Sequence, residues 1–111
     1  MAIDTASAKS AVTLEEAKAH LRVDDESEDA LIAALCLACT QMAEHELQRP
    51  LITREGSEGF GDSPSDVPQG IRQWILLHVG HYFEHREAAT PTNYQALPYL
   101  GALLDPWRVW S

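Results

Sequence analysis

The chain has few basic residues and no long apolar run, and each shortage argues against a class of protein. Eight Lys and Arg residues stand against 17 Asp and Glu residues, which gives a formal net charge of −9. Because phosphate binding needs clustered Lys and Arg, this balance argues against a protein that wraps nucleic acid. It is compatible with DNA that passes nearby, since an acidic wall repels the polyanion. No apolar run approaches the ~20 residues of a membrane span, so we expect no membrane partner.

Cysteine is also scarce, and its placement argues against redox chemistry. Cys36 and Cys39 stand in an apolar, alanine-rich stretch. A CxxC redox pair needs a helix N-terminus or a basic neighbour to stabilise its thiolate, and neither is near. We therefore expect buried free thiols in a reducing compartment. The N-terminus lacks the apolar core of a signal peptide, which favours synthesis in a cytoplasm.

Two helices are predicted in the first half of the chain. Thr13 and Glu16 have the spacing of a capping box, which predicts a short amphipathic helix over residues 14–21. An acidic turn follows. No helix breaker then occurs until Pro50, so we expect one long helix over about residues 27–47.

Two further helices are predicted in the second half. Pro68 fits the first position of a helix that continues to about Glu87, with an apolar stripe at helical spacing. Pro98 is expected to open a short last helix through Leu104. The fold class predicted is all-α: a small bundle of three to four helices around one long central helix, folded as a single domain of 111 residues.

Three segments are predicted to lie outside this bundle because they lack helical periodicity. They are a flexible arm over residues 1–11, a long mobile loop over residues 53–67, and an extended C-terminal tail over residues 105–111. The loop is rich in glycine and serine and is longer than most connections, so we expect it to be either functional or disordered.

Three blocks of sequence occur in a characteristic order. The first is TLEEAKAHLRVD over residues 13–24, with RPL over residues 49–51; the second is VGHYFEHRE over residues 79–87; the third is LPYLGALLDPWR over residues 97–108. Together they resemble the head–tail connector proteins of tailed bacteriophages, also called adaptor or head-completion proteins. Trp107 departs from that pattern, in which tyrosine is usual.

The resemblance implies a virion structural protein and no enzymatic activity. It implies a subunit of a ring, commonly twelvefold, that joins the portal of the phage head to the tail and extends the DNA channel at the virion neck. The implied partners are further copies of the chain, the portal protein and a tail-side neck or stopper protein. DNA would pass through without sequence-specific binding, no cofactor is implied, and assembly would take place in the host cytoplasm.

The long helix is apolar over much of its circumference, which leaves two interpretations. It is either a central helix surrounded by the others, or a helix that also packs on neighbouring subunits, and the resemblance favours the second. The residues assigned to the subunit interface are Leu31, Ala34, Leu37, Ala38, Glu84 and Arg86.

Two exposed segments complete the predicted binding residues. The loop residues expected to face the channel or the next ring are Arg54, Glu55, Glu58, Phe60 and Asp62. Phe60, the only large apolar residue of the loop, either anchors it to a partner or folds back. The tail residues assigned to portal or subunit binding are Trp107, Arg108, Val109 and Trp110, because Trp and Arg are enriched at interface hot spots. The alternative is that one or both tryptophans pack into their own domain.

Other function classes find weaker support. His78, His81 and His85 share a strip of the predicted third helix, and His81 and His85 have the i, i+4 spacing of zinc-binding histidines. A small metal-binding helical module is therefore the alternative, although no metal site is assigned; a generic helical adaptor without portal contact is another. No catalytic Ser-His-Asp or Cys-His spacing occurs. A helix-turn-helix is excluded because acidic residues open its second helix.

Overall fold

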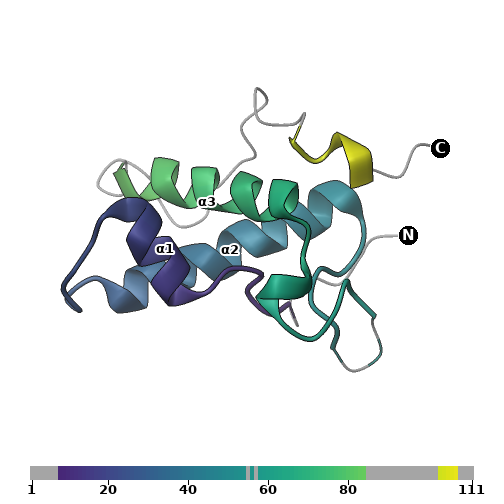
Figure 1. Ribbon diagram of the computed structural model, residues 1–111, viewed down its shortest axis with the longest axis horizontal. Helices are drawn as coiled ribbons and strands as arrows, with labels where there is room; N and C mark the ends of the chain where they lie inside the picture. The colour runs from purple at the N-terminus through teal and green to yellow at the C-terminus, as the bar shows by residue number, and fades with distance from the viewer. Residues whose placement is uncertain (1–7, 55, 57, 85–102, 108–111) are drawn as a thin grey trace.

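The computed structural model describes residues 8–54, 56, 58–84 and 103–107. These residues contain three α-helices, two short 3-10 helices and no strand (Figure 1). The elements are α1 (Leu14–Leu21), α2 (Asp29–Leu47), η1 (Pro64–Asp66), α3 (Gln69–Glu84) and η3 (Asp105–Trp107). The predicted all-α class is confirmed. The predicted helix from Pro98 to Leu104 lies largely outside the described residues.

Helix α1 begins as its capping box predicts. The Thr13 hydroxyl accepts a hydrogen bond from the Glu16 N–H at 3.0 Å, and the Glu16 carboxylate accepts one from the Thr13 N–H at 3.4 Å. These two bonds satisfy N–H groups that a helix start otherwise leaves unpaired. The helix ends at Arg22, which adopts the left-handed conformation with φ 59°.

Helix α2 begins and ends for different reasons. Its N-cap, Glu28, makes no side-chain capping bond, and Asp29 in the first turn complements the positive end of the helix dipole. At the other end Gln48 turns left-handed with φ 54°, and its N–H bonds to the Glu44 carbonyl. The helix therefore ends at a left-handed cap that precedes Pro50.

Helix α3 begins one residue later than the sequence predicts. Pro68 lies just before Gln69, and its carbonyl accepts hydrogen bonds from the N–H groups of Ile71 and Arg72, both at 3.1 Å. A proline has no N–H to lose at this position, so it starts the helix without cost. The described helix reaches Glu84, and the predicted continuation to Glu87 lies outside the described residues.

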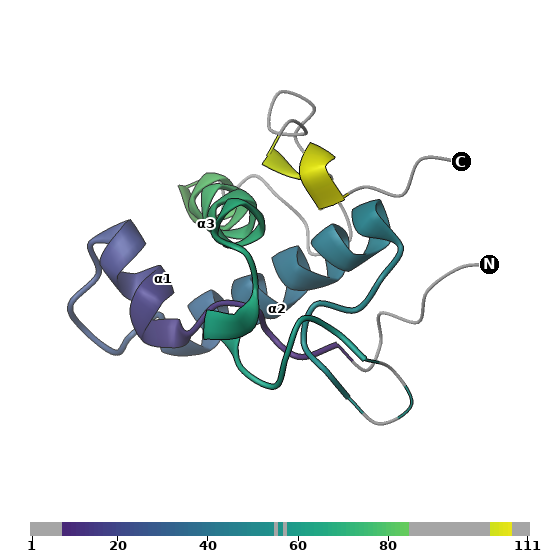
Figure 2. The ribbon, with the colours of Figure 1, turned by 45° about the vertical axis from the view of Figure 1, so that its right-hand side comes forward.

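The core lies mainly between α2 and α3, and α1 packs against both (Figures 1 and 2). An ion pair between Arg72 of α3 and Glu16 of α1 joins these two helices at the surface. The largest completely buried core side chains include Ile32, Leu35, Leu47, Ile71, Trp74, Ile75 and Val79. Trp74, only 1% exposed, is the largest of these buried side chains.

The segment before α1 is fixed at Ala11, where the sequence predicts part of a flexible arm. Ala11 is completely buried, and its N–H donates a hydrogen bond to the Thr40 hydroxyl at 3.0 Å. Thr40 in turn donates to the Cys36 carbonyl at 2.8 Å, so the segment is fixed to the middle of α2. The prediction of an arm through residue 11 is therefore wrong at Ala11, because a buried N–H must find a partner. Residues 1–7 lie outside the described residues.

Candidate docking surfaces

One side of α2 faces away from the core and carries no charge. The sequence has no charged residue between Asp29 and Glu44. Ala34 and Leu37, two residues predicted for a subunit interface, are exposed, and Leu37 is 36% exposed. Ala30 and Ala33 continue this surface, and they were not among the predicted interface residues. The helical spacing of these alanines and Ala34 could have indicated that all three lie on one face of the helix. We call Ala30, Ala33, Ala34, Leu37 and Ala38 the outer face of α2.

The remaining predicted interface residues are distributed unevenly. Leu31 and Ala38 are half-buried at the edge of the outer face of α2. Glu84 is exposed at the end of α3. Arg86 lies outside the described residues.

Arg54 does not occupy the exposed position that the loop prediction assigned to it. It is 7% exposed, and its Nη1 lies 2.8 Å from the completely buried Glu44 carboxylate. Charged side chains are buried in this way when they are paired, so Arg54 is a structural residue of the loop base. Glu44 was missed by the sequence reasoning. Its signal was its position as the first charged residue after the long uncharged stretch that follows Asp29.

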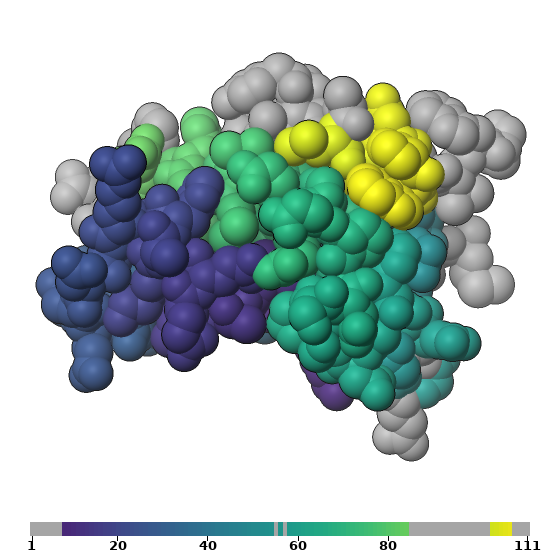
Figure 3. Space-filling view, in the orientation of Figure 1, coloured from purple at the N-terminus to yellow at the C-terminus, as the bar shows by residue number. Residues whose placement is uncertain are grey.

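The loop between α2 and α3 is partly ordered by its own contacts. An isolated bridge links Ile52 and Gly61, and the Phe60 N–H donates to the Leu51 carbonyl at 2.8 Å. Phe60 folds back against the core, with the Arg49 guanidinium 3.8 Å from its ring centroid. Of its two predicted roles, the structure thus shows the second. In Figure 3 this segment forms a lobe at the lower right of the visible face.

The outer rim of the same loop is polar. Glu58 and Asp62, both predicted to face a partner, are exposed. They line a shallow hollow together with Thr53, Arg54, Gly56 and Gly61. Glu55, the last predicted loop residue, lies outside the described residues. The loop therefore exposes the carboxylates of Glu58 and Asp62 to solvent, whereas the charge of Arg54 is buried and paired with Glu44.

The described part of the C-terminal tail packs on its own domain. Leu104 is completely buried, and Trp107 is half-buried against the core. A Cβ on Gly70 would lie 2.9 Å from the Trp107 ring, so the absent side chain of Gly70 makes the seat for this indole. The tail was predicted to be extended, but η3 gives Asp105–Trp107 a helical turn. The predicted binding residues Arg108, Val109 and Trp110 lie outside the described residues.

Of the three histidines that were predicted to share a strip of the third helix, neither of the two that the structure describes is exposed. His78 is completely buried, its Nδ1 lies 2.8 Å from the Trp74 carbonyl, and burial lowers its pKa. Its ring stacks on Trp74 with centroids 3.8 Å apart. His81 is half-buried, and His85 lies outside the described residues. Within the described ranges no three His, Cys, Asp or Glu side chains gather as a metal site would require.

The prediction that the two cysteines are buried free thiols is confirmed. Cys36 and Cys39 are both free and buried in the core. Burial raises the pKa of the Cys36 thiol to about 11, helped by the charge of Glu16, and burial raises the pKa of Cys39 as well. Protonated thiols of this kind are poor nucleophiles and poor metal ligands. Both cysteines therefore act as small apolar core residues.

These features define a small protein whose described elements are all helical. In the described part of the chain, no helix has the length and apolar character needed to span a membrane. The sequence matches the family model of the phage gp6-like head-tail connector proteins over residues 11–108. The chain therefore belongs to this family, and the resemblance carried by the three sequence blocks is confirmed. No curated protein matches the chain, and no solved structure does.

Family membership defines the coarse function. The family consists of structural, non-enzymatic phage proteins, so the chain has a structural role in the virion, where the head joins the tail. Membership also implies contact with portal and tail proteins within an oligomer. The surfaces described above are the candidates for these contacts.

Proposed function

We propose that the chain is one subunit of a ring, commonly twelvefold in such connectors, at the virion neck. The ring joins the portal to the tail and extends the channel through which DNA passes without sequence-specific binding. Subunits are made in the host cytoplasm and assemble there through complementary surfaces. A portal protein lies on one side of the ring, and a tail-side neck or stopper protein lies on the other.

The observation that carries the ring proposal is the outer face of α2. Two copies of a chain with formal net charge −9 repel one another most where their carboxylates meet. The outer face is apolar and free of charge, and all of its residues except Ala38 are exposed, so it is a surface that a second copy approaches at low electrostatic cost. Its alanines also let a neighbouring element approach α2 closely, because interaxial distance depends on side-chain size.

The proposed portal contact lies beyond Trp107. Leu104 and Trp107 are packed against their own core, so they hold the base of the tail. Arg108, Val109 and Trp110 follow directly and are the residues that we assign to the portal, since Arg and Trp anchor interfaces well. Trp107 supports this contact from inside the domain.

The loop between α2 and α3 is proposed to face the channel or the next ring. Its outward side chains include Glu58 and Asp62, whereas its described arginine, Arg54, is buried against Glu44. A carboxylate-bearing surface repels a DNA backbone, which favours passage over binding. A structure of the assembled neck with this loop on the outer wall would refute this placement.

The ring proposal is tested with two alanine-to-glutamate substitutions that place the same charge on two different surfaces of the protein. Ala34→Glu places a charge in the outer face of α2, and Ala19→Glu places the same charge on an exposed position of α1. Native mass spectrometry of the purified chains, and their cosedimentation with portal-bearing heads, measures assembly. We expect wild type and Ala19→Glu to form rings of about a dozen subunits. Ala34→Glu is expected to stay monomeric with its helix content unchanged, and normal ring formation by this variant would contradict the proposed interface.

A further inference from the structure

Glu44 lies at the junction between α2 and the following loop, and its backbone ends the helix. Its carbonyl accepts hydrogen bonds from the N–H groups of Gln48 and Arg49, the latter at 3.3 Å. Because Gln48 is left-handed, these bonds turn the chain back toward the helix that it has just left. The chain therefore passes directly over the Glu44 side chain.

The side chain of Glu44 holds the start of the loop from inside the protein. Its Oε2 accepts a hydrogen bond from the Leu51 N–H at 3.0 Å and another from Arg54 Nη1 at 2.8 Å. Glu44 is 0% exposed and Arg54 is 7% exposed, so water competes little for either bond. Hydrogen bonds to an ionised carboxylate are shorter and stronger than neutral ones. One oxygen atom thus fixes both the backbone and a side chain of this segment.

The rest of the loop closes on the segment that Glu44 holds. The Thr53 N–H donates to the Gly61 carbonyl at 2.8 Å, and the Phe60 N–H donates to the Leu51 carbonyl at 2.8 Å. The Gly59 N–H adds a bond of 3.1 Å to the Thr53 hydroxyl. The returning half of the loop therefore depends on groups between residues 51 and 53, which lie within the part fixed by Glu44.

We propose that Glu44 is the positioning residue that makes the loop base, residues 51–54 with residues 59–61, preformed in the isolated subunit. Without the carboxylate charge, the buried Arg54 guanidinium loses its ion pair with Glu44, and the segment from Leu51 to Arg54 is released. The returning half then loses its partners at Leu51 and Thr53. A loop ordered in advance avoids the entropy cost of ordering it when a partner binds. This property belongs to the single chain and does not depend on the ring or on the portal.

Amide hydrogen exchange in a Glu44→Gln variant tests the proposal, with the Thr53 and Phe60 amides as reporters. We expect the exchange rates of both amides to rise about tenfold or more relative to that of the Val79 amide in α3, because the loop opens locally in addition to any loss of global stability. Glu58→Gln is the control, since it removes an exposed carboxylate from the same loop and leaves the Glu44–Arg54 pair in place. Its reporter amides are expected to exchange at the wild-type rate.

A second variant covers the case in which Glu44→Gln does not fold. Arg54→Lys keeps both charges but lacks the planar fork of the guanidinium, so we expect the same local acceleration at smaller size. Wild-type exchange at Thr53 and Phe60 in a folded Glu44→Gln variant would overturn the proposal. The same result in Arg54→Lys would overturn it if Glu44→Gln unfolds. Equal acceleration in the loop and in α3 would also overturn it, since the pair would then be a general stabiliser.

Discussion

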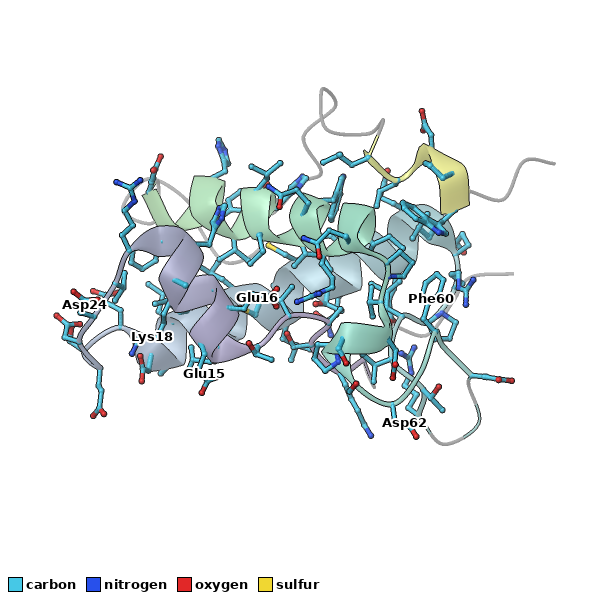
Figure 4. The ribbon with its side chains drawn as sticks, viewed as in Figure 1. Glu15, Glu16, Lys18, Asp24, Phe60 and Asp62 are labelled. Carbon is cyan, nitrogen blue, oxygen red and sulfur yellow. The ribbon has the colours of Figure 1, made fainter. Side chains whose placement is uncertain are left out.

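The two connections at the ends of α2 are held in very different ways. Figure 4 shows Asp24 of the first connection at one end of the molecule and Phe60 and Asp62 of the second at the other. In the first, over residues 22–28, Asp25 and Ser27 are exposed and bond to each other at 2.9 Å. In the second, over residues 48–68, buried apolar residues join a buried ion pair.

The difference shows that loop composition and loop anchorage are separate properties. The second connection is long and rich in glycine and serine, yet Leu51 is 0% and Ile52 2% exposed. The first is short and acidic, and the ion pair beside it, Lys18 to Asp29 at 2.8 Å, lies at the surface. Exposed pairs of this kind contribute little because water and salt screen them. A few buried residues therefore decide which connection is fixed.

The largest contrast is expected when one arginine is removed from each connection. Arg54→Met leaves the Glu44 carboxylate buried without its partner, which we expect to lower the free energy of unfolding by about 3–5 kcal/mol. Arg22→Met, at the exposed end of α1, is expected to change it by less than about 0.5 kcal/mol. Urea denaturation followed by circular dichroism measures both. Similar losses in the two variants would remove the proposed difference between the connections.

A smaller contrast is expected from apolar truncation. Leu51→Ala opens a cavity at a completely buried site, which should cost about 3 kcal/mol. Val23→Ala, at a half-buried site in the first connection, should cost roughly 1 kcal/mol at most. The midpoints of urea denaturation compare the two. A Leu51→Ala loss no larger than that of Val23→Ala would mean that the loop base is not part of the core.

A third contrast uses the space around a glycine. A Cβ on Gly59 would lie 2.5 Å from the Leu51 carbonyl oxygen, so Gly59→Ala must displace backbone at the loop base. We expect a cost of about 1–3 kcal/mol, as in other overpacked sites. Ser27→Ala, in the exposed first connection, should stay within about 0.5 kcal/mol. Thermal unfolding detects the difference, and an unchanged midpoint for Gly59→Ala would show that the two halves of the loop are not in contact.

Acid is expected to give the smallest contrast between the two connections. It lowers the stability of the core between them, through His78, which lies in neither connection. Burial lowers the pKa of His78 in the folded protein below its ordinary value of 6.5. The unfolded chain therefore binds this proton first, and stability falls as pH drops below about 6.5 toward the folded-state pKa. Stability measured from pH 7.5 to 5 should lose this contribution to its slope in His78→Leu and keep it in the exposed control His20→Gln. An unchanged slope in His78→Leu would refute the role of His78.

Sequence reasoning predicts what depends on neighbouring residues. The capping box of Thr13 and Glu16 and the position of Pro68 specify helix starts within a residue, because capping is local. The pairing of Glu44 with Arg54 and the seat of Trp107 on Gly70 were missed, because they depend on how the helices pack. The three sequence blocks led to the family, and the subunit contacts assigned from them remain proposals.

The buried thiols of α2 affect how the protein ages once it is part of a particle. With the Cys36 pKa raised to about 11, its thiolate fraction at neutral pH is about one in ten thousand. Oxidants and alkylating reagents therefore find almost no reactive sulfur in a folded subunit. A subunit that opens exposes both cysteines to these reagents. Labelling with an alkylating reagent, which modifies a thiol permanently, would thus report the fraction of subunits that open while the reagent is present.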